Sequence, residues 1–309
     1  MAQLQRIGVV VVGLGRAGRV RLRDLMEATA PELQGVHLVG YVSKRKVEIE
    51  GAQQIELEAA LANPDVKAVF VCTENKRHEE LARQCLEAGK HVLVEYPLAL
   101  TRAGAEGLFA LAKRKGVVLH EEEIGLLLHS NQILMKRVSE AGLLVSADYT
   151  KTAGINWWIA NMADSGSPFV SSISTLHLMV SLFGELTPRD ACIRATETGI
   201  ESWATLLTKE NKPVHVRINR MNDPDTKRST SYQFSFEGGV VIDNVNLNAE
   251  GGPEVPSSPY GLFMQDFIMF IDTVRGRRDA TAYNQRALHC LDLTDKFLEL
   301  AKQNKHSQL

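Results

Sequence analysis

The stretch IGVVVVGLGRAG, residues 7–18, is the part of the sequence that decides the fold. A run of β-branched apolar residues predicts a buried strand, and a G-x-G-x-x-G pattern follows it directly. In that setting Gly13 permits a tight turn, Gly15 lets a pyrophosphate approach the backbone, and Gly18 lets the next helix pack closely. The N-terminus of that helix stabilises phosphate charge. The turn predicts a dinucleotide-binding site, and a flexible glycine-rich turn without a ligand is the alternative.

The sequence around this turn alternates between strand and helix patterns as far as residue 120. The predicted strands are short apolar runs over residues 7–12, 36–42, 68–72, 91–94 and 117–120. The predicted helices have apolar residues at helical spacing, over residues 17–28, 57–62, 78–88 and 103–115. Such alternation with continuously apolar strands is typical of a parallel sheet covered on both faces. We therefore predict an α/β fold in which residues 1–122 form a doubly wound, Rossmann-type dinucleotide-binding domain.

The rest of the chain has a different pattern. Its expected helices and extended segment cover residues 123–141, 148–153, 171–183, 263–275 and 285–303. Between residues 191 and 247 polar and apolar residues alternate, which predicts an antiparallel sheet with one solvated face. Residues 123–309 are therefore predicted to form an α+β substrate domain on a large open antiparallel sheet.

Composition and charge exclude several classes of protein. The 309 residues carry 35 Lys and Arg against 37 Asp and Glu, so the chain lacks the basic surplus of a nucleic-acid binder. No apolar run approaches the ~18 residues of a membrane-spanning helix. The four cysteines are scattered without a C-x-x-C pair, which predicts no metal site and no disulfide framework. We expect a cytoplasmic globular protein, slightly more consistent with a monomer than with a dimer.

The end of the second predicted strand indicates which dinucleotide is bound. NAD-specific proteins place an acidic residue there to bind the ribose hydroxyls. Here Ser43, Lys44 and Arg45 follow the strand, and the next carboxylate is Glu48. A hydroxyl and cations suit a 2′-phosphate, because a guanidinium pairs with phosphate oxygens. We predict NADPH as the preferred cofactor, with NADH also accepted; a solvated surface charge run is the alternative.

Polar residues follow the later strands at the edge where parallel sheets bind ligands. We expect Tyr96 beside the nicotinamide, where its hydroxyl, protonated at neutral pH, can donate a hydrogen bond or a proton. A core aromatic is the alternative. The expected cofactor contacts, in the glycine turn and at this edge, are Gly13, Gly15, Arg16, Ala17, Gly18, Ser43, Lys44, Arg45, Cys72, Thr73, Glu74, His78, Glu95 and Tyr96.

Three adjacent carboxylates, Glu121, Glu122 and Glu123, close the last strand of the first domain. Such a run usually begins a solvated helix, whose dipole it complements. One or two of the three could instead face the ligand cleft, and we take Glu122 as the candidate.

Several segments together resemble biliverdin reductases of the A type, within the glucose–fructose oxidoreductase and inositol dehydrogenase family. They are residues 7–25, IGVVVVGLGRAGRVRLRDL; 41–45, YVSKR; 89–97, GKHVLVEYP; 118–122, VLHEE; and 181–186, SLFGEL. The match is close over residues 7–125 and fainter across 195–260. The wider family usually has E-K-P, with a catalytic lysine, after the strand that here covers residues 91–94, and Tyr96 stands in the place of that lysine, as in biliverdin reductases. The wider family's catalytic Asp and His align with Val170 and Ser174, neither of which can act as a general base.

The resemblance implies reduction of biliverdin to bilirubin, in heme breakdown, by hydride transfer to the central methine carbon of this linear tetrapyrrole. It implies Tyr96, with Glu95 and Glu122 as polar partners, as the catalytic group. It also implies substrate contacts at Tyr96, Ser171, Ser174 and Thr175.

The chain departs from biliverdin reductases at two positions. Thr175 stands where those enzymes carry an Arg, and Gly125 where they carry a Glu. Two alternatives therefore stay open: another NADP-dependent oxidoreductase of the same family, and a non-catalytic paralogue that binds NADP or a bilin.

Overall fold

The computed structural model describes residues 6–28, 30–155, 161–223, 225–245 and 255–307 of the chain. Contacts along the chain divide it into two units. Unit 1 contains Met1–Ile124 and Ser258–Leu288, and unit 2 contains Gly125–Ser257 and His289–Leu309. The sequence pattern predicts a second domain over residues 123–309, whereas these contacts place Ser258–Leu288 with unit 1.

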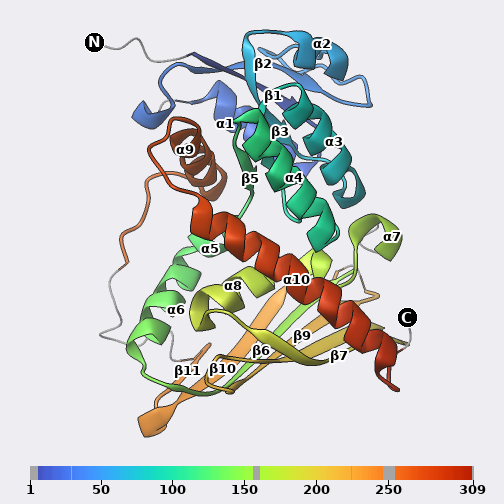
Figure 1. Cartoon of the computed structure of the whole chain (residues 1–309), viewed down its shortest axis with the longest axis vertical. Coiled ribbons are helices and arrows are strands. Elements are labelled where there is room, and N and C mark those ends of the chain that lie inside the picture. The colour runs from blue at the N-terminus through green and yellow to red at the C-terminus, as the bar shows by residue number, and fades with distance from the viewer. Residues whose placement is uncertain (1–5, 29, 156–160, 224, 246–254, 308–309) are drawn as a thin grey trace. The chain divides into compact units, whose positions relative to one another are not determined.

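Unit 1 is built on a five-stranded parallel sheet with the order β2-β1-β3-β4-β5 (Figure 1). Its strands are β1 (Ile7–Val12), β2 (Val36–Val42), β3 (Val66–Val71), β4 (His91–Val94) and β5 (Leu119–Glu121). Its helices are α1 (Arg16–Met26), α2 (Leu57–Ala62), α3 (Asn75–Glu87), α4 (Arg102–Lys115) and α9 (Leu262–Val274). Because β2 and β3 lie on opposite sides of β1, the carboxyl ends of β1 and β3 form the topological switch point where such sheets bind ligands.

Local signals explain why these segments form as predicted. All six residues of β1 are buried, as a strand covered on both faces requires. Helix α4 begins at Thr101, whose side chain accepts a hydrogen bond from the Gly104 N–H at 3.2 Å, and ends at Gly116, which has φ +65°. Helices α3 and α4 pack side by side on the sheet (Figure 1).

Helix α9 belongs to unit 1 although it lies far along the chain. Phe267 and Phe270 of α9 contact Phe70 of β3 edge-on, with ring centroids 5.1 and 5.7 Å apart. Both side chains are buried in the apolar cluster that also contains Val9 and Val11 of β1. Burying one such side chain stabilises the fold by about 1.5–3 kcal/mol, so this packing attaches α9 to the parallel sheet.

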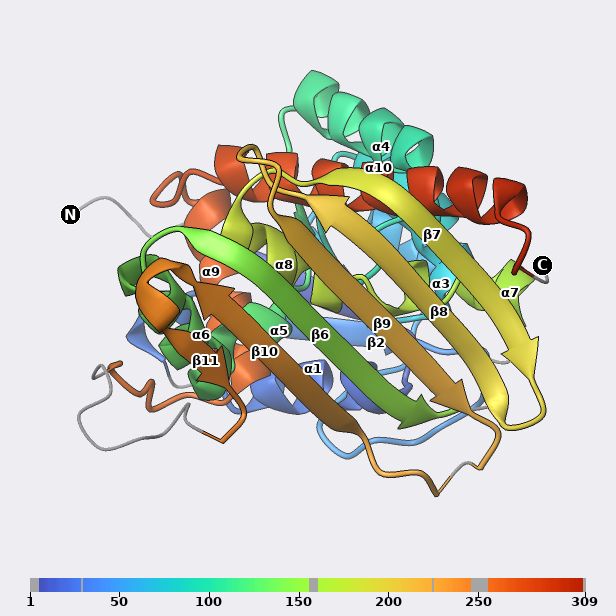
Figure 2. The same ribbon diagram turned by 90° about the horizontal axis from the view of Figure 1, so that it is seen from below.

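Unit 2 is built on a six-stranded sheet with the order β11-β10-β6-β9-β8-β7 (Figure 2). Its strands are β6 (Leu144–Gly154), β7 (Thr187–Thr196), β8 (Gly199–Leu207), β9 (Pro213–Met221), β10 (Ser229–Phe236) and β11 (Val241–Asp243). Its helices are α5 (Ile124–Leu127), α6 (His129–Glu140), α7 (Met162–Ser165) and α8 (Ser174–Phe183), and α10 (Thr281–Gln303) begins in unit 1 and ends in unit 2. Helices α6 and α8 lie over one face of the sheet, which Figure 2 shows from the other side.

The structure refines three expectations for unit 2. The large sheet is antiparallel except for the pair β6 and β9, which is parallel, so the sheet is mixed. These two strands are far apart in sequence, so no hairpin makes them antiparallel. The helix expected over residues 123–141 is two helices, because Leu128 has non-helical φ −56° and ψ 126°. The helix expected over 171–183 is the tight turn Val170–Ser172 followed by α8. None of the described helices is long and apolar enough to cross a membrane.

Candidate functional site

The three glycines of the first turn are needed for two different reasons. Gly13 has φ +95°, and a Cβ there would lie 2.5 Å from the carbonyl oxygen of Cys72. A Cβ on Gly18 would lie 1.9 Å from the carbonyl oxygen of Gly13. At the exposed Gly15, however, the nearest atom to an added Cβ is 4.0 Å away. The fold requires glycine at the first two positions, whereas the space beside Gly15 is left for a ligand that approaches the backbone.

The residues around this open space fit a dinucleotide pyrophosphate. Helix α1 begins with Arg16 and Ala17, and its first turn contains no acidic residue that would repel a phosphate. The N–H groups of a first helical turn lack partners within the helix and can bind an anion. Thr73, at the end of β3, has a buried hydroxyl with no hydrogen-bond partner among the described residues. A bound cofactor would supply such a partner.

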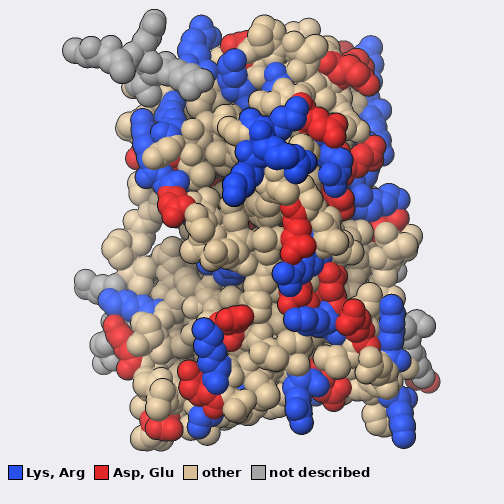
Figure 3. All heavy atoms as spheres, in the orientation of Figure 1, with Lys and Arg blue, Asp and Glu red and all other residues tan. Residues whose placement is uncertain are grey.

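The loop after β2 presents its cations to solvent. Ser43 is half-buried and its hydroxyl accepts a hydrogen bond from the Arg45 N–H at 3.2 Å, while Lys44 and Arg45 are exposed. The Gln54 side chain donates to the carbonyl oxygens of Ser43 and Arg45 at 2.8 and 3.3 Å. Gln54 therefore fixes the backbone of this loop and leaves its basic side chains available to a phosphate. On the face drawn in Figure 3, both basic and acidic side chains are present.

His78, predicted as a cofactor contact, ties two loops together. Its Nδ1 lies 2.8 Å from the carbonyl oxygen of Pro97, and its Nε2 lies 3.0 Å from that of Thr73. Burial lowers the pKa of His78, so the ring is neutral and donates to one carbonyl at a time. His78 thereby connects the loop after β3 to the loop that carries Tyr96. Its neighbour Glu74 is exposed at the start of α3.

Glu95 and Tyr96 directly follow β4, at the carboxyl edge of the sheet. Tyr96 is half-buried. The side chain of Glu95 is held by Arg21 of α1. Its Oε1 accepts a hydrogen bond from Arg21 Nε at 2.9 Å and lies 3.9 Å from the Cys72 thiol. Glu95 is thus anchored in the unit, and its carboxylate is positioned by α1.

A buried charged network underlies this edge. Arg21 of α1 also donates to Asp266 of α9 at 2.5 Å, and the other oxygen of Asp266 lies 2.8 Å from His120 Nε2. The ring of Tyr283 stacks on His120 with centroids 4.9 Å apart. Arg21, Asp266 and His120 are each at most 1 % exposed. The network joins α1, β5 and α9, and Arg21 links it to Glu95.

Several carboxylates surround the single guanidinium group of this network. The pKa values of these carboxylates therefore shift in different directions. Burial would raise the pKa of Asp266, but Arg21 and His120 outweigh it and lower that pKa to about 2. Burial, then the charges of Glu95 and Asp266, raise the pKa of Glu122 well above its usual range. Asp266 is therefore the ionised partner of Arg21, whereas the environment of Glu122 favours its protonated form.

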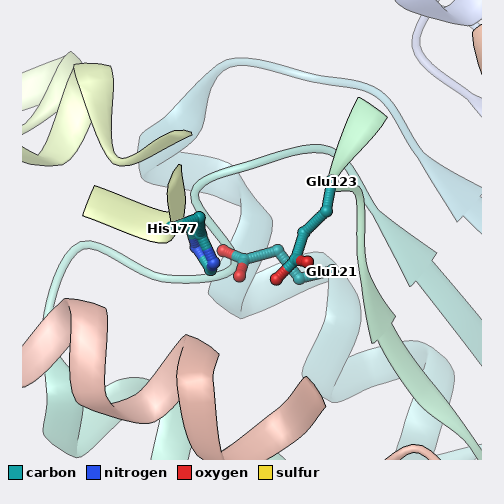
Figure 4. A group of neighbouring side chains, drawn as sticks. All are labelled: Glu121, Glu123 and His177. Atoms are coloured by element: carbon teal, nitrogen blue, oxygen red, sulfur yellow. The ribbon is translucent and has the colours of Figure 1, made fainter. Parts of the chain in front are cut away.

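The three consecutive carboxylates are not a solvated helix start, because Glu121, Glu122 and Glu123 are all buried. Glu121 accepts a hydrogen bond from the Leu98 N–H at 2.7 Å, and Glu123 pairs with Arg286. Glu122 accepts from the Ile124 N–H at 2.5 Å. Figure 4 draws Glu121 and Glu123 at the end of β5, and His177, a buried residue of α8 in unit 2. Glu121 and Glu123 are thus engaged in contacts that hold unit 1 together.

The predicted substrate residues lie at the start of α8 in unit 2. Ser171 and Thr175 are buried, and Ser174 is half-buried. A Cβ on Gly125 would lie 3.6 Å from the Cβ of Ser174, an ordinary contact, so Gly125 and Ser174 are neighbours. The two departures from biliverdin reductases, at Gly125 and Thr175, therefore flank the same stretch. The sequence also offers Trp157 and Trp158 as candidate walls for a flat apolar ligand, with plain core residues as the alternative. Both tryptophans lie outside the described residues.

Sequence reasoning missed the charged partners that other parts of the chain supply. Asp266 was assigned to the second domain, and Arg21 was passed over within the first helix. One signal was available: Arg21 falls among the buried residues Gly18, Leu22 and Leu25 on the apolar face of α1. A cation at such a position requires a buried partner.

Comparisons with known proteins agree with this geometry. Residues 7–123 match the family model described as an oxidoreductase family with an NAD-binding Rossmann fold. The chain is 36% identical to human biliverdin reductase A, over 94% of this chain and 95% of the human protein. Its identity to mouse biliverdin reductase A is 35%, over 96% of each chain.

A solved structure has the same fold. The crystal structure of biliverdin reductase from Synechocystis, in complex with biliverdin and NADP+, matches with a TM-score of 0.82 at 23% identity, covering 96% of this chain and 99% of that one. The identity to the human and mouse proteins, over nearly the whole chain, places the protein in its family. The chain belongs to the biliverdin reductase A family, within the oxidoreductases that have an NAD-binding Rossmann fold.

Proposed function

We propose that this protein reduces biliverdin to bilirubin with NADPH as its preferred reductant and NADH as a second one. The observation that carries the proposal is the 36% identity to biliverdin reductase A over nearly the full length of both chains. Two local features support it: Tyr96 occupies the position of the wider family's catalytic lysine, and Val170 and Ser174 offer no general base for alcohol oxidation.

The glycine turn and the loop after β2 would hold the cofactor. The pyrophosphate fits the open space at Gly15, at the N-terminus of α1, and the 2′-phosphate fits Ser43, Lys44 and Arg45. When bound, the dihydronicotinamide supplies a hydride, which goes to the central methine carbon of biliverdin while a proton goes to a neighbouring pyrrole nitrogen.

The chain's own contribution is positioning and polar contact. His78 holds the loop that carries Tyr96 through Pro97, and Arg21 holds Glu95. Tyr96 would donate a hydrogen bond that orients the substrate. Glu122, whose pKa is raised by burial and by the charges of Glu95 and Asp266, is a second polar group for the same purpose, and the transferred proton comes from solvent.

Unit 2 would supply the remaining substrate contacts. We assign these to Ser171, Ser174 and Thr175 at the start of α8. Hydroxyl groups at these positions can bond the lactam and pyrrole groups of a bilin, whereas they lack the charge that its propionates require.

The test follows the visible spectrum of purified protein mixed with biliverdin and NADPH, and then NADH. Conversion of the green bilin band to the yellow bilirubin band, dependent on both protein and cofactor, is the expected result. NADPH oxidation without that conversion would favour another reductase of the family, assayed next with small carbonyl substrates. Bilin binding with no oxidation of NADPH would identify a non-catalytic paralogue and overturn the proposal.

A substitution tests the proposed role of Tyr96. We expect Tyr96→Phe to lower kcat or raise the KM for biliverdin by about tenfold, since it removes one hydrogen bond to a substrate held in place. NADPH affinity, measured by fluorescence, should stay within twofold. If turnover and substrate affinity both survived the change, Tyr96 would have no such role.

We also propose a cytoplasmic location and a monomeric state. All four cysteines are buried and none forms a disulfide bond, which suits a reducing compartment. Sedimentation analysis of the purified protein tests the oligomeric state, and a stable dimer would contradict this part of the proposal.

A further inference from the structure

The inner face of the unit 2 sheet carries a group of cations at one end. Side chains alternate along β6, so Lys151 points to the same face as the buried Tyr149 and Ala153. On β9, Arg220 is buried and pairs in register with Ala153, so it lies on that face next to Lys151. Thr230 of β10 lies directly opposite Lys151. We call Lys151, Arg220 and the nearby Arg228 the sheet-face cation cluster.

Two members of this cluster lack a counter-charge. Among the residues that the structure describes, Lys151 and Arg228 form no ion pair. Arg220 donates through its Nη2 to the Ser172 hydroxyl and to the Ser171 carbonyl oxygen. Burial, with the charges of Arg228 and Arg220, lowers the pKa of Lys151 to about 7. Cations held together without an anion cost free energy, which a bound anion would offset.

Aromatic side chains adjoin the cluster on the same face. Tyr149 pairs in register with Tyr232, and their rings are nearly parallel, with centroids 6.4 Å apart. The ring of Phe234 lies 5.1 Å from that of Tyr232. The hydroxyl of Tyr232 is buried and has no hydrogen-bond partner among the described residues, which points to a ligand that supplies one.

We propose that the sheet-face cation cluster binds the propionate carboxylates of the bilin, a role that rests on the proposed function. A linear tetrapyrrole has a flat apolar body and two carboxylates along one edge, which matches flat aromatic rings followed by cations. Arg220 can bond a carboxylate through its planar fork, and Lys151 supplies a point charge. Arg220 also reaches the turn Val170–Ser172 that precedes α8. It thereby brings a guanidinium beside the helix on which Thr175 replaces the arginine of biliverdin reductases.

The test compares biliverdin with its dimethyl ester, which has the same ring system without the two charges. We expect Lys151→Met to raise the Kd and KM for biliverdin about tenfold, as the loss of one charge-assisted contact predicts, with kcat within twofold. Affinity for the diester should not change. Arg220→Lys should have a smaller effect than Arg220→Met, since it keeps the charge and loses only the fork.

Arg217→Met is the matched control, because Arg217 is exposed on β9 and points to the opposite face of the sheet. We expect it to bind both substrates as the unchanged protein does. Bilin binding is titrated by visible absorbance without NADPH, so the cluster is tested even in a protein with no turnover. Binding without turnover would contradict the proposed function and leave this proposal to be decided by the variants.

Three results would overturn the proposal. One is an equal loss of affinity for biliverdin and the diester in Lys151→Met, which would indicate lost packing. Another is a weaker affinity for NADPH in that variant, which would make the cluster a phosphate site. The third is no biliverdin binding by the unchanged protein, which would overturn the proposed substrate as well.

Discussion

The two units contain cations in different electrostatic situations. In unit 1, Arg21 is fully buried and bonded to Asp266 and Glu95, so its charge is balanced by the chain itself. In unit 2, Lys151 lies on the sheet beside two other cations, Arg220 and Arg228, and the charges of both lower its pKa. The first arrangement holds the fold together. The second destabilises the folded state through repulsion between cations, and under our proposal the carboxylates of the bilin relieve that repulsion.

The largest effect should come from breaking the balanced network. Asp266→Asn leaves Arg21 buried without its main counter-charge, and we expect the free energy of unfolding to fall by about 3–5 kcal/mol. Urea denaturation at neutral pH measures it. Because the pKa of Asp266 is lowered to about 2, its contribution is present above pH 4 and is lost as the pH falls towards 2.

The control for this prediction is an exposed ion pair. Arg102 and Glu106 on α4 are about half-exposed, so Glu106→Gln should change the free energy of unfolding by less than about 1 kcal/mol. An equally small loss in Asp266→Asn would mean that the buried network has no structural role.

The exposed cations Lys44 and Arg45 of unit 1 are a third case, because a solvated charge does not destabilise the folded state. We expect the double change Lys44→Gln and Arg45→Gln to lower the preference for NADPH over NADH by about tenfold, since it removes two groups that suit the 2′-phosphate. Steady-state kinetics with both cofactors measures the ratio. Lys67→Gln, at an exposed position of β3, is the control and should leave the ratio unchanged.

Removing a cation from the sheet-face cation cluster should stabilise the protein. The folded pKa of Lys151, about 7, lies below the usual lysine value, so its protonated form disfavours the folded state. We expect Lys151→Met to raise the free energy of unfolding by about 1 kcal/mol at pH 6, with the gain shrinking as the pH rises towards 10. Urea denaturation across this range tests it, and a loss of stability in Lys151→Met would place Lys151 with the balanced cations.

The smallest expected effect is a pH dependence of bilin affinity. As the pH rises from 6 to 8, Lys151 loses its proton, so the Kd for biliverdin should rise a few-fold with a midpoint near pH 7. Arg220 and Arg228 are the cations that act on Lys151, while Tyr149 and Tyr232, whose pKa values are raised by burial, stay neutral. The Lys151→Met variant should show a flat profile; a slope that persisted would come from another group, such as His177 on α8.

Prediction from sequence succeeded where a signal is local. The strand over residues 7–12, the turn at Gly13, Gly15 and Gly18, and the helix after it are specified within a few neighbouring residues. The same holds for α4, which has a capping Thr101 and ends at Gly116. The helix expected over residues 123–141 was wrong because side-chain periodicity does not report one non-helical residue, Leu128.

The sequence by itself determined the parallel sheet, the dinucleotide turn and the segment that carries Tyr96, because strands, turns and helix ends are governed by residues close together in the chain. Only the tertiary structure decided which charges are balanced. Arg21 and Asp266 are 245 positions apart, and Lys151 meets Arg220 across strands that pair in parallel. Such partners depend on how distant elements pack, and no pattern of neighbouring residues encodes them.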